Sequence, residues 1–190
     1  MHRRLAVLLL ASFAFSAVAC QDIAGPTADI APVADTLTAR ALNGTPFGSY
    51  SALDLYLSRV AAPDGSLSFD LVFDLDADGK PMLIPVSKIA ICNRLCQVGL
   101  QVVNDSTFDQ LTRARVRGFT YDTPITVAIG KPVYIVAKSY GCSGSIYSND
   151  LYAKLVVDSV HTVDRSIFFR VVADPNCGFR GLVPGVTPKN

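Results

Sequence analysis

The sequence of 190 residues contains no glutamate and no tryptophan, and it has only two histidines. All 16 acidic residues are aspartate, a poor helix former, so the composition disfavours long helices. The lack of glutamate also excludes sites that require this residue, such as a complete EF-hand loop. A net charge of +1 argues against a nucleic-acid partner, and an apolar content of 50% excludes global disorder.

The N-terminal segment has the pattern of an export signal. His2, Arg3 and Arg4 form a short basic region, and a charge-free apolar run, Leu5 to Val18, follows it. This run is too short to cross a bilayer, which needs roughly 20 apolar residues in a helix. A basic start, a short apolar run and small residues at its end are typical of a secretory signal peptide.

The end of this run, Ala17-Val18-Ala19-Cys20, resembles the lipobox of bacterial lipoproteins. In that family the cysteine becomes the first mature residue and carries lipid, so the resemblance implies that Cys20 is lipidated. The alternative is an ordinary signal peptide cut near Ala19. Gln21, rather than an aspartate, follows the cysteine. The resemblance therefore implies a cell-envelope lipoprotein in the outer membrane of a Gram-negative bacterium.

We expect three regions along the chain: a signal peptide at 1–19, a flexible lipid-anchored tether at 20–49 and a single β-domain at 50–190. Proline and glycine interrupt the tether too often for a stable element, as in Gly25-Pro26 and Asn43-Gly44. The alternative for part of this segment is a first edge strand. Removing residues 1–19 lowers the basic residues from 17 to 15 against 16 acidic ones, so the mature chain is nearly neutral.

From Tyr50 onward, many short runs of alternating apolar and polar residues predict an all-β fold. The expected architecture is an antiparallel β-sandwich or a partly open barrel of about 8–10 short strands. Two runs, Leu151 to Val163 and Ile167 to Ala173, flank Asp164-Arg165-Ser166 and predict a hairpin. The other predicted strand regions are Leu53 to Leu57, Leu67 to Phe73, Val98 to Val103, Arg113 to Tyr121, Ile125 to Ile129 and Val133 to Lys138.

Four cysteines remain besides Cys20. If the chain is exported, the oxidising compartment that it enters favours disulfides between them. Among the three pairings that four cysteines allow, we favour Cys92–Cys96 and Cys142–Cys177. The first pair closes a small loop between two apolar runs, and the second ties a Gly/Ser-rich loop to the C-terminal segment. A zinc site built from all four thiolates is the less favoured alternative, because the spacing contains no paired CxxC.

Asp74, Asp76 and Asp78, followed by Gly79, place three carboxylates on one loop. Such a loop suits a hard cation, so calcium is a weak cofactor candidate. The full EF-hand pattern fails because its twelfth position is Pro85. The flanking residues resemble strands, and the favoured interpretation is therefore a hairpin turn at Asp78-Gly79 with solvated aspartates and no resident cofactor.

Arg113, Arg115 and Arg117 occupy every second position, and the same spacing continues to Phe119 and Tyr121. A strand would place all five side chains on one face. Basic residues with aromatics would suit an anionic polymer or a lipid headgroup, so Arg113, Arg115, Arg117 and Tyr121 are weak ligand-binding candidates. The favoured alternative is an outer sheet face whose arginines pair with aspartates.

The C-terminal third contains Tyr152 to Val160 and Ile167 to Val171, which are similar to the closing hairpin of HmuY-like heme-scavenging surface lipoproteins. That resemblance implies a tethered all-β domain. Heme would also need axial histidine or methionine ligands, and the chain after Cys20 offers only His161 and Met82. The resemblance therefore supports the architecture and location more than heme binding.

These features favour a non-catalytic binding or structural domain on a surface lipoprotein, with a protein or small-ligand partner. A carrier of calcium or heme is the alternative. A hydrolase ranks third, because His161 is the only histidine after Cys20, and Gly141-Cys142-Ser143-Gly144-Ser145 departs from the G-x-S-x-G motif. We therefore expect no enzymatic activity and no catalytic residues.

Overall fold

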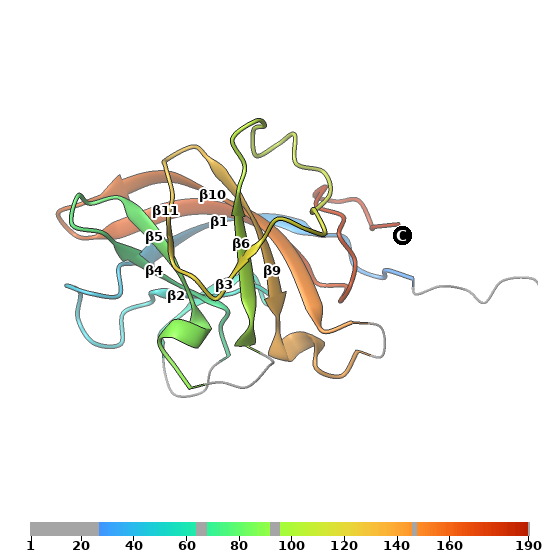
Figure 1. The fold of residues 1–190 in the computed structure, drawn as a ribbon, viewed down its shortest axis with the longest axis horizontal. Coiled ribbons are helices and arrows are strands. Elements are labelled where there is room, and N and C mark those ends of the chain that lie inside the picture. Colours follow the sequence, from blue (N-terminus) through green and yellow to red (C-terminus); the bar gives the residue numbers. More distant parts are fainter. Residues whose placement is uncertain (1–26, 64–67, 92–95, 146–147, 190) are drawn as a thin grey trace, which may run out of the picture.

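The computed structural model describes residues 27–63, 68–91, 96–145 and 148–189, and these residues form an antiparallel β-sandwich (Figure 1). The predicted fold class is confirmed. The described residues contain eleven strands rather than about 8–10, because several are only two or three residues long. No helix in this part of the chain is long and apolar enough to cross a membrane.

One sheet has six strands in the order β1-β11-β10-β9-β6-β7, and the other has five in the order β3-β2-β4-β5-β8. The strands of the larger sheet are β1 Val33–Arg40, β6 Val98–Val102, β7 Thr120–Tyr121, β9 Pro132–Lys138, β10 Asp150–His161 and β11 Ser166–Asp174. Those of the smaller sheet are β2 Ala52–Asp54, β3 Arg59–Ala61, β4 Leu71–Leu75, β5 Pro81–Pro85 and β8 Ile125–Thr126. Short 3₁₀ turns include η1 Val86–Lys88 and η3 Tyr140–Cys142.

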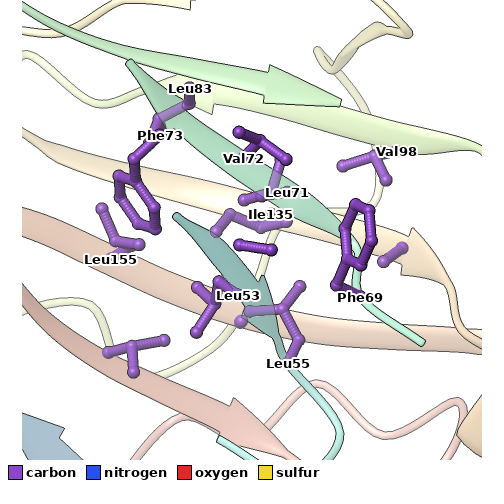
Figure 2. Close-up of a cluster of buried hydrophobic side chains, with 14 of the residues drawn as sticks. Leu53, Leu55, Phe69, Leu71, Val72, Phe73, Leu83, Val98, Ile135 and Leu155 are labelled. Atoms are coloured by element: carbon purple, nitrogen blue, oxygen red, sulfur yellow. The ribbon is translucent and has the colours of Figure 1, made fainter. Parts of the chain in front are cut away.

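The core lies between the two sheets and follows from the period-two pattern of the strands. Leu155 on β10 points toward the smaller sheet, where Leu53 and Phe73 lie (Figure 2), and Phe169 on β11 belongs to the same buried cluster. The rings of Phe73 and Phe169 stack with centroids 4.4 Å apart. The predicted hairpin of β10 and β11 is confirmed, and the two strands pair along most of their length.

A second apolar cluster covers the outer face of the larger sheet. The connection from β6 to β7 and the C-terminal segment pack there against Val156 and Val172. Lys154 is only 2% exposed, and its Nζ donates to the carbonyls of Phe108 and Leu111 at 2.9 Å each. The central strands are therefore buried on both faces. The remaining members of this outer cluster are Val103, Phe108, Leu111, Ala114, Tyr134 and Leu182.

The predicted strand from Arg113 to Tyr121 is wrong, because only Thr120–Tyr121 joins a sheet. Ala114 packs into the outer cluster, and its N–H donates to the carbonyl of Arg180 at 2.8 Å. Gly118 adopts a φ of +88°, a conformation that interrupts an extended strand. The C-terminal segment therefore replaces a neighbouring strand as the hydrogen-bonding partner.

The predicted boundary between tether and domain at residue 50 is also wrong. Strand β1 lies within the segment expected to be a tether, and all eight of its residues pair with β11. Ala39 and Ala41 are buried against the core, where small side chains let the chain approach the sandwich closely. The alternative of a first edge strand is therefore correct for Val33–Arg40.

The predicted strand from Leu53 to Leu57 ends early, at Asp54. The chain turns there because Asp54 Oδ1 accepts a hydrogen bond from the N–H of Leu57, at 3.1 Å, and Ser58 takes a positive φ of 49°. Leu53 and Leu55 are buried, whereas Leu57 is more than half exposed. This turn forms one wall of a cavity that contains two buried carboxyls.

Candidate functional site

A cavity of about 350 Å³ lies at one end of the sandwich, between the β2–β3 turn and η3. It combines aromatic side chains with carboxylates, which is typical of small-ligand sites. Its described lining residues are Asp54, Tyr56, Leu57, Arg59, Ser68, Phe69, Asp70, Val86, Cys96, Ser139, Tyr140 and Gly141.

Asp54 and Asp70 enter this cavity because of the register between β2 and β4. Leu53 pairs with Leu71 in antiparallel orientation, so Asp54, which follows Leu53, lies beside Asp70, which precedes Leu71. Each of the two aspartates is only 6% exposed. In sequence, both residues fit the solvent-facing positions of alternating runs, and only the register between distant strands brings them together. Local sequence patterns therefore did not identify them as site residues.

Hydrogen bonds and an ion pair hold the two carboxyls in place. Asp70 Oδ2 accepts from the N–H of Leu55 at 2.9 Å. Asp54 Oδ2 lies 3.5 Å from Nε of Arg59, whose side chain is largely exposed. Burial raises the pKa of Asp70 from 3.8 to about 7, the Leu55 hydrogen bond opposes this shift, and the charge of Asp54 adds to it. Asp70 therefore changes charge near neutral pH.

The aromatic wall of the cavity depends on a glycine. A Cβ added at Gly141 would lie 2.2 Å from Cγ of Tyr56, so this ring rests directly on the backbone of η3. Ser139 immediately precedes η3 as its N-cap, and its side chain accepts a hydrogen bond from the N–H of Gly141. Tyr56 and Tyr140 thus line the same cavity as the two aspartates. The arrangement suits a ligand with an apolar body and a cationic or hydrogen-bond-donating group.

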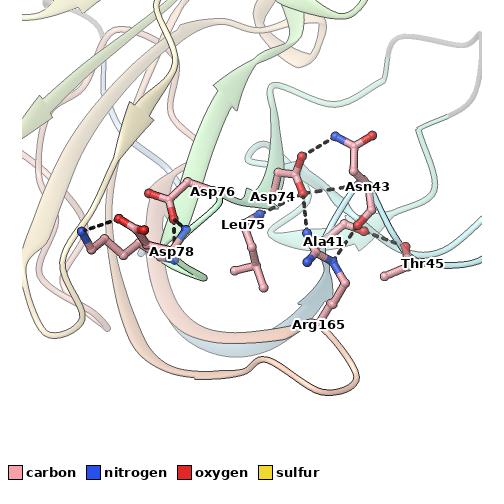
Figure 3. Close-up of polar contacts among 9 residues, drawn as sticks. Ala41, Asn43, Thr45, Asp74, Leu75, Asp76, Asp78 and Arg165 are labelled. Carbon is pink, nitrogen blue, oxygen red and sulfur yellow. Dashed lines mark hydrogen bonds and ion pairs between the residues drawn. The ribbon is translucent and has the colours of Figure 1, made fainter.

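Asp74 at the end of β4 and Asp76 and Asp78 in the β4–β5 turn do not converge on a common point (Figure 3). Asp74 is buried, and it accepts hydrogen bonds from Asn43 and faces Arg165 at 3.4 Å. Asp76 Oδ1 accepts from the N–H groups of Asp78 and Lys80, at 2.9 and 2.8 Å. Among the described residues, no three histidine, cysteine or aspartate side chains are grouped closely enough to bind a metal.

The predicted turn between β4 and β5 is present, and Gly79 takes a φ of +76° within it. Asp78 is exposed and faces Lys80 at 3.3 Å. The hairpin connection is therefore present as predicted, but the prediction that the aspartates are solvated is wrong for Asp74, which is only 6% exposed. Each of the three aspartates therefore has hydrogen-bond or ion-pair partners of its own in the turn or the neighbouring loop.

The arginine stripe, Arg113, Arg115 and Arg117, is exposed as predicted, although it lies on a loop rather than on a strand. Arg115 lies 3.5 Å from Asp105, with its guanidinium 5.8 Å from the ring centre of Tyr134. Arg113 donates to the carbonyl of Lys189 at 3.3 Å. Arg115 thus contacts the sheet at Tyr134, and Arg113 contacts the C-terminal segment at Lys189. The fourth weak ligand-binding candidate, Tyr121, is on β7, partly exposed and beside Phe119.

The Cys142–Cys177 disulfide is present, with an S–S distance of 2.07 Å, and this predicted pairing is confirmed. Cys96 is buried and lines the cavity, whereas Cys92 and Cys20 lie outside the described residues. The Cys92–Cys96 pairing and the lipidation of Cys20 therefore remain predictions.

The two candidate heme ligands lie on different sheets. His161 is exposed at the end of β10 and packs its ring against Phe168, with centroids 5.1 Å apart. Its acidic neighbours face other groups, because Asp158 pairs with Arg170 and Asp164 with Arg40. Met82 is on β5 in the smaller sheet.

A larger hollow of about 540 Å³ lies beside residues 42–49. Its remaining described lining residues are Ser51, Pro63 and Ile89, so no charged side chain is among the described residues that line it. The cavity at Asp54 and Asp70 is therefore the better candidate site. Comparisons with protein-family models, with curated proteins and with solved structures find no match to this chain.

Proposed function

We propose that this protein is an exported lipoprotein of the bacterial cell envelope, held in the outer membrane by lipid on Cys20. Its β-sandwich is a non-catalytic binding domain. The observation that carries the binding role is the cavity of about 350 Å³, in which Asp54 and Asp70 are buried beside Tyr56 and Tyr140. The Leu55 N–H and Arg59 occupy part of the hydrogen-bonding capacity of these carboxyls, and a ligand with a cationic or donor group would use the remaining capacity.

The anchor is tested by changing Cys20→Ser in the full chain. We expect the unsubstituted protein in the membrane fraction and the variant in the soluble fraction of the envelope. Ser12→Ala, a change within the apolar run, is the matched control and keeps the protein in the membrane fraction. A Cys20→Ser variant that stays with the membranes would disprove lipid anchoring.

A specific form of this function is the binding of a small organic cation. Asp70 supplies a carboxyl poised to ionise, and the tyrosines supply π faces for a cationic group. Benzylammonium is a suitable probe because it joins an aromatic body to a primary ammonium group.

Isothermal titration of the Cys20→Ser variant with benzylammonium tests whether the cavity binds an organic cation. We expect the affinity to rise between about pH 5.5 and pH 8, as Asp70 loses its proton, and to fall about tenfold or more in Asp70→Asn. Asp78→Asn, on the exposed turn, is the matched control. Equal affinity in Asp70→Asn and the unsubstituted protein would exclude the cation as ligand.

A further inference from the structure

The chain enters the sandwich at a well-defined place. The N–H groups of Asp29 and Ile30 both donate to Oδ1 of Asn176, at 2.9 and 3.1 Å, and Nδ2 of Asn176 donates to the carbonyl of Ile30 at 2.6 Å. Asn176 lies two residues after β11 and also donates to Asp174. These contacts hold the start of the described chain against the end of β11, one residue from the Cys142–Cys177 disulfide.

An exposed apolar groove of about 280 Å³ lies at this entry point. Ile30, Val33 and Leu57 line it and are 55%, 63% and 54% exposed. Val186 on the C-terminal segment is also more than half exposed, and the neighbouring Gly185 donates to the carbonyl of Pro32 at 2.9 Å. The apolar side chains therefore surround the place where the chain enters. The remaining groove residues are Ala31, Asp35, Leu55, Tyr56, Ser58, Ala173 and Pro175.

The connection to the lipid anchor is short. Cys20 precedes Asp29 by nine residues, and a fully extended chain covers at most about 3.3–3.6 Å per residue, so lipid on Cys20 stays within roughly 30 Å of the groove. The β10–β11 hairpin is at the far end of the larger sheet, because Arg40 pairs with Ser166 there and Val33 pairs with Ala173 at the entry (Figure 1). Its tip residue Val163 is 99% exposed.

We propose that the groove end of the sandwich rests on the lipid surface, with Ile30, Val33 and Leu57 inserted into the interfacial region of the bilayer. This inference rests on the proposed lipid anchor. Exposed apolar side chains that lie within reach of the anchor add a further contact with the lipid surface. Asp35 is the charged member of the described groove lining, so apolar insertion rather than headgroup charge provides the attraction, and neutral lipids suffice.

The absence of tryptophan allows a direct test of this orientation. The full lipidated protein is prepared as two single-tryptophan variants, Leu57→Trp at the groove and Val163→Trp at the distal hairpin. Each is reconstituted into phosphatidylcholine vesicles, with or without bromine on the acyl chains as a contact quencher of tryptophan fluorescence. We expect bromine to lower the Leu57→Trp emission about twofold or more and to leave Val163→Trp nearly unchanged, because interfacial insertion reaches about 5–10 Å into the lipid.

Ile30→Trp serves as a second reporter of the groove, and the melting temperature of each variant confirms that the sandwich is folded. Vesicle flotation separates the two proposals. Protein that floats with vesicles while both groove reporters remain unquenched would overturn the orientation and leave the anchor intact. Protein that does not float would overturn the anchor itself. Concentration-dependent dimers of the Cys20→Ser form that bury Leu57 would instead assign the groove to a second copy of the chain.

Discussion

Asp70 is a carboxyl that ordinary alternation would place in water and that the register between β2 and β4 buries instead. Its folded-state pKa of about 7 lies above the ordinary value of 3.8, mainly because of burial. The folded protein therefore keeps a proton that the unfolded chain releases. For this group, stability is highest below about pH 4 and decreases as the pH rises to about 7.

We predict that Asp70→Asn flattens the pH dependence of stability between about pH 4 and pH 7. Relative to the unsubstituted protein, the variant should gain about 2–4 kcal/mol over that interval, because asparagine is neutral throughout and still accepts a hydrogen bond from Leu55. Urea unfolding at several pH values measures this difference. Burial also raises the pKa of Asp174, so part of the pH dependence of stability remains in Asp70→Asn. An unchanged pH profile would show that Asp70 is ionised in the fold.

The three aspartates of the β4–β5 turn differ in burial, and we predict that their alanine variants differ in stability in the same order. Asp74→Ala should cost about 2–3 kcal/mol, because it leaves Arg165 and the Asn43 amide without this acceptor. Asp76→Ala should cost about 1 kcal/mol, because two N–H groups then lack their acceptor. Asp78→Ala, which removes an exposed ion pair, should change stability by less than about 1 kcal/mol. Urea unfolding of the three variants measures the order.

Thermal unfolding with calcium and with a chelator should give the same melting temperatures. Any calcium affinity should be no tighter than about 0.1–1 mM, because the three carboxylates face different partners. Micromolar binding that disappears in Asp76→Ala would contradict this interpretation of the turn.

At the scale of elements, the arginine stripe shows why a period-two pattern is not sufficient to define a strand. The spacing of Arg113, Arg115 and Arg117 is that of a strand, yet the Arg113–Gly181 bridge and the Ala114 side chain connect this segment to the C-terminal segment. The arginines are exposed in the loop, as they would be on an outer sheet face. Sequence periodicity therefore predicts exposure better than it predicts hydrogen-bonding partners.

We predict that replacing Arg113, Arg115 and Arg117 together with glutamine preserves the sandwich. The hydrogen bonds and ion pairs of these arginines are exposed, and surface ion pairs contribute about 0–1 kcal/mol each, so stability should decrease by less than about 2 kcal/mol. Circular dichroism and urea unfolding of the triple variant measure the decrease. A variant that fails to fold would show that the loop depends on these side chains far more than their exposure indicates.

At the scale of the whole molecule, the Cys142–Cys177 disulfide connects η3, which forms a wall of the cavity, to the segment that follows β11. We predict that Cys142→Ala lowers the free energy of unfolding by about 2–5 kcal/mol, because the bridge joins residues separated by 35 positions. Thermal unfolding of the oxidised protein and of the variant measures the effect. Asp78→Ala provides a surface control, and equal melting temperatures in Cys142→Ala and the unsubstituted protein would contradict this role.

The all-β class, the β10–β11 hairpin, the β4–β5 turn and one disulfide could all be predicted from the sequence. The first three depend on local information, namely period-two alternation and turn residues with positive φ, and the disulfide follows from the oxidising compartment that the predicted export signal implies. The pairing of β1 with β11 could not be predicted, because it joins segments that are distant in the chain. In addition, the prolines and glycines on either side of β1 are typical of a tether.

By itself, the sequence determined that the chain forms an all-β fold of short strands, because alternation decides which side chains leave water, and the structure decided for a sandwich over a barrel. Only the tertiary structure decided where the buried polar side chains lie close together. Asp54 and Asp70 become neighbours only when β2 and β4 take one particular register, and Tyr56 completes the cavity only where Gly141 lets its ring approach. Such contacts between distant segments depend on the geometry of the packed sheets, which local residue patterns do not contain.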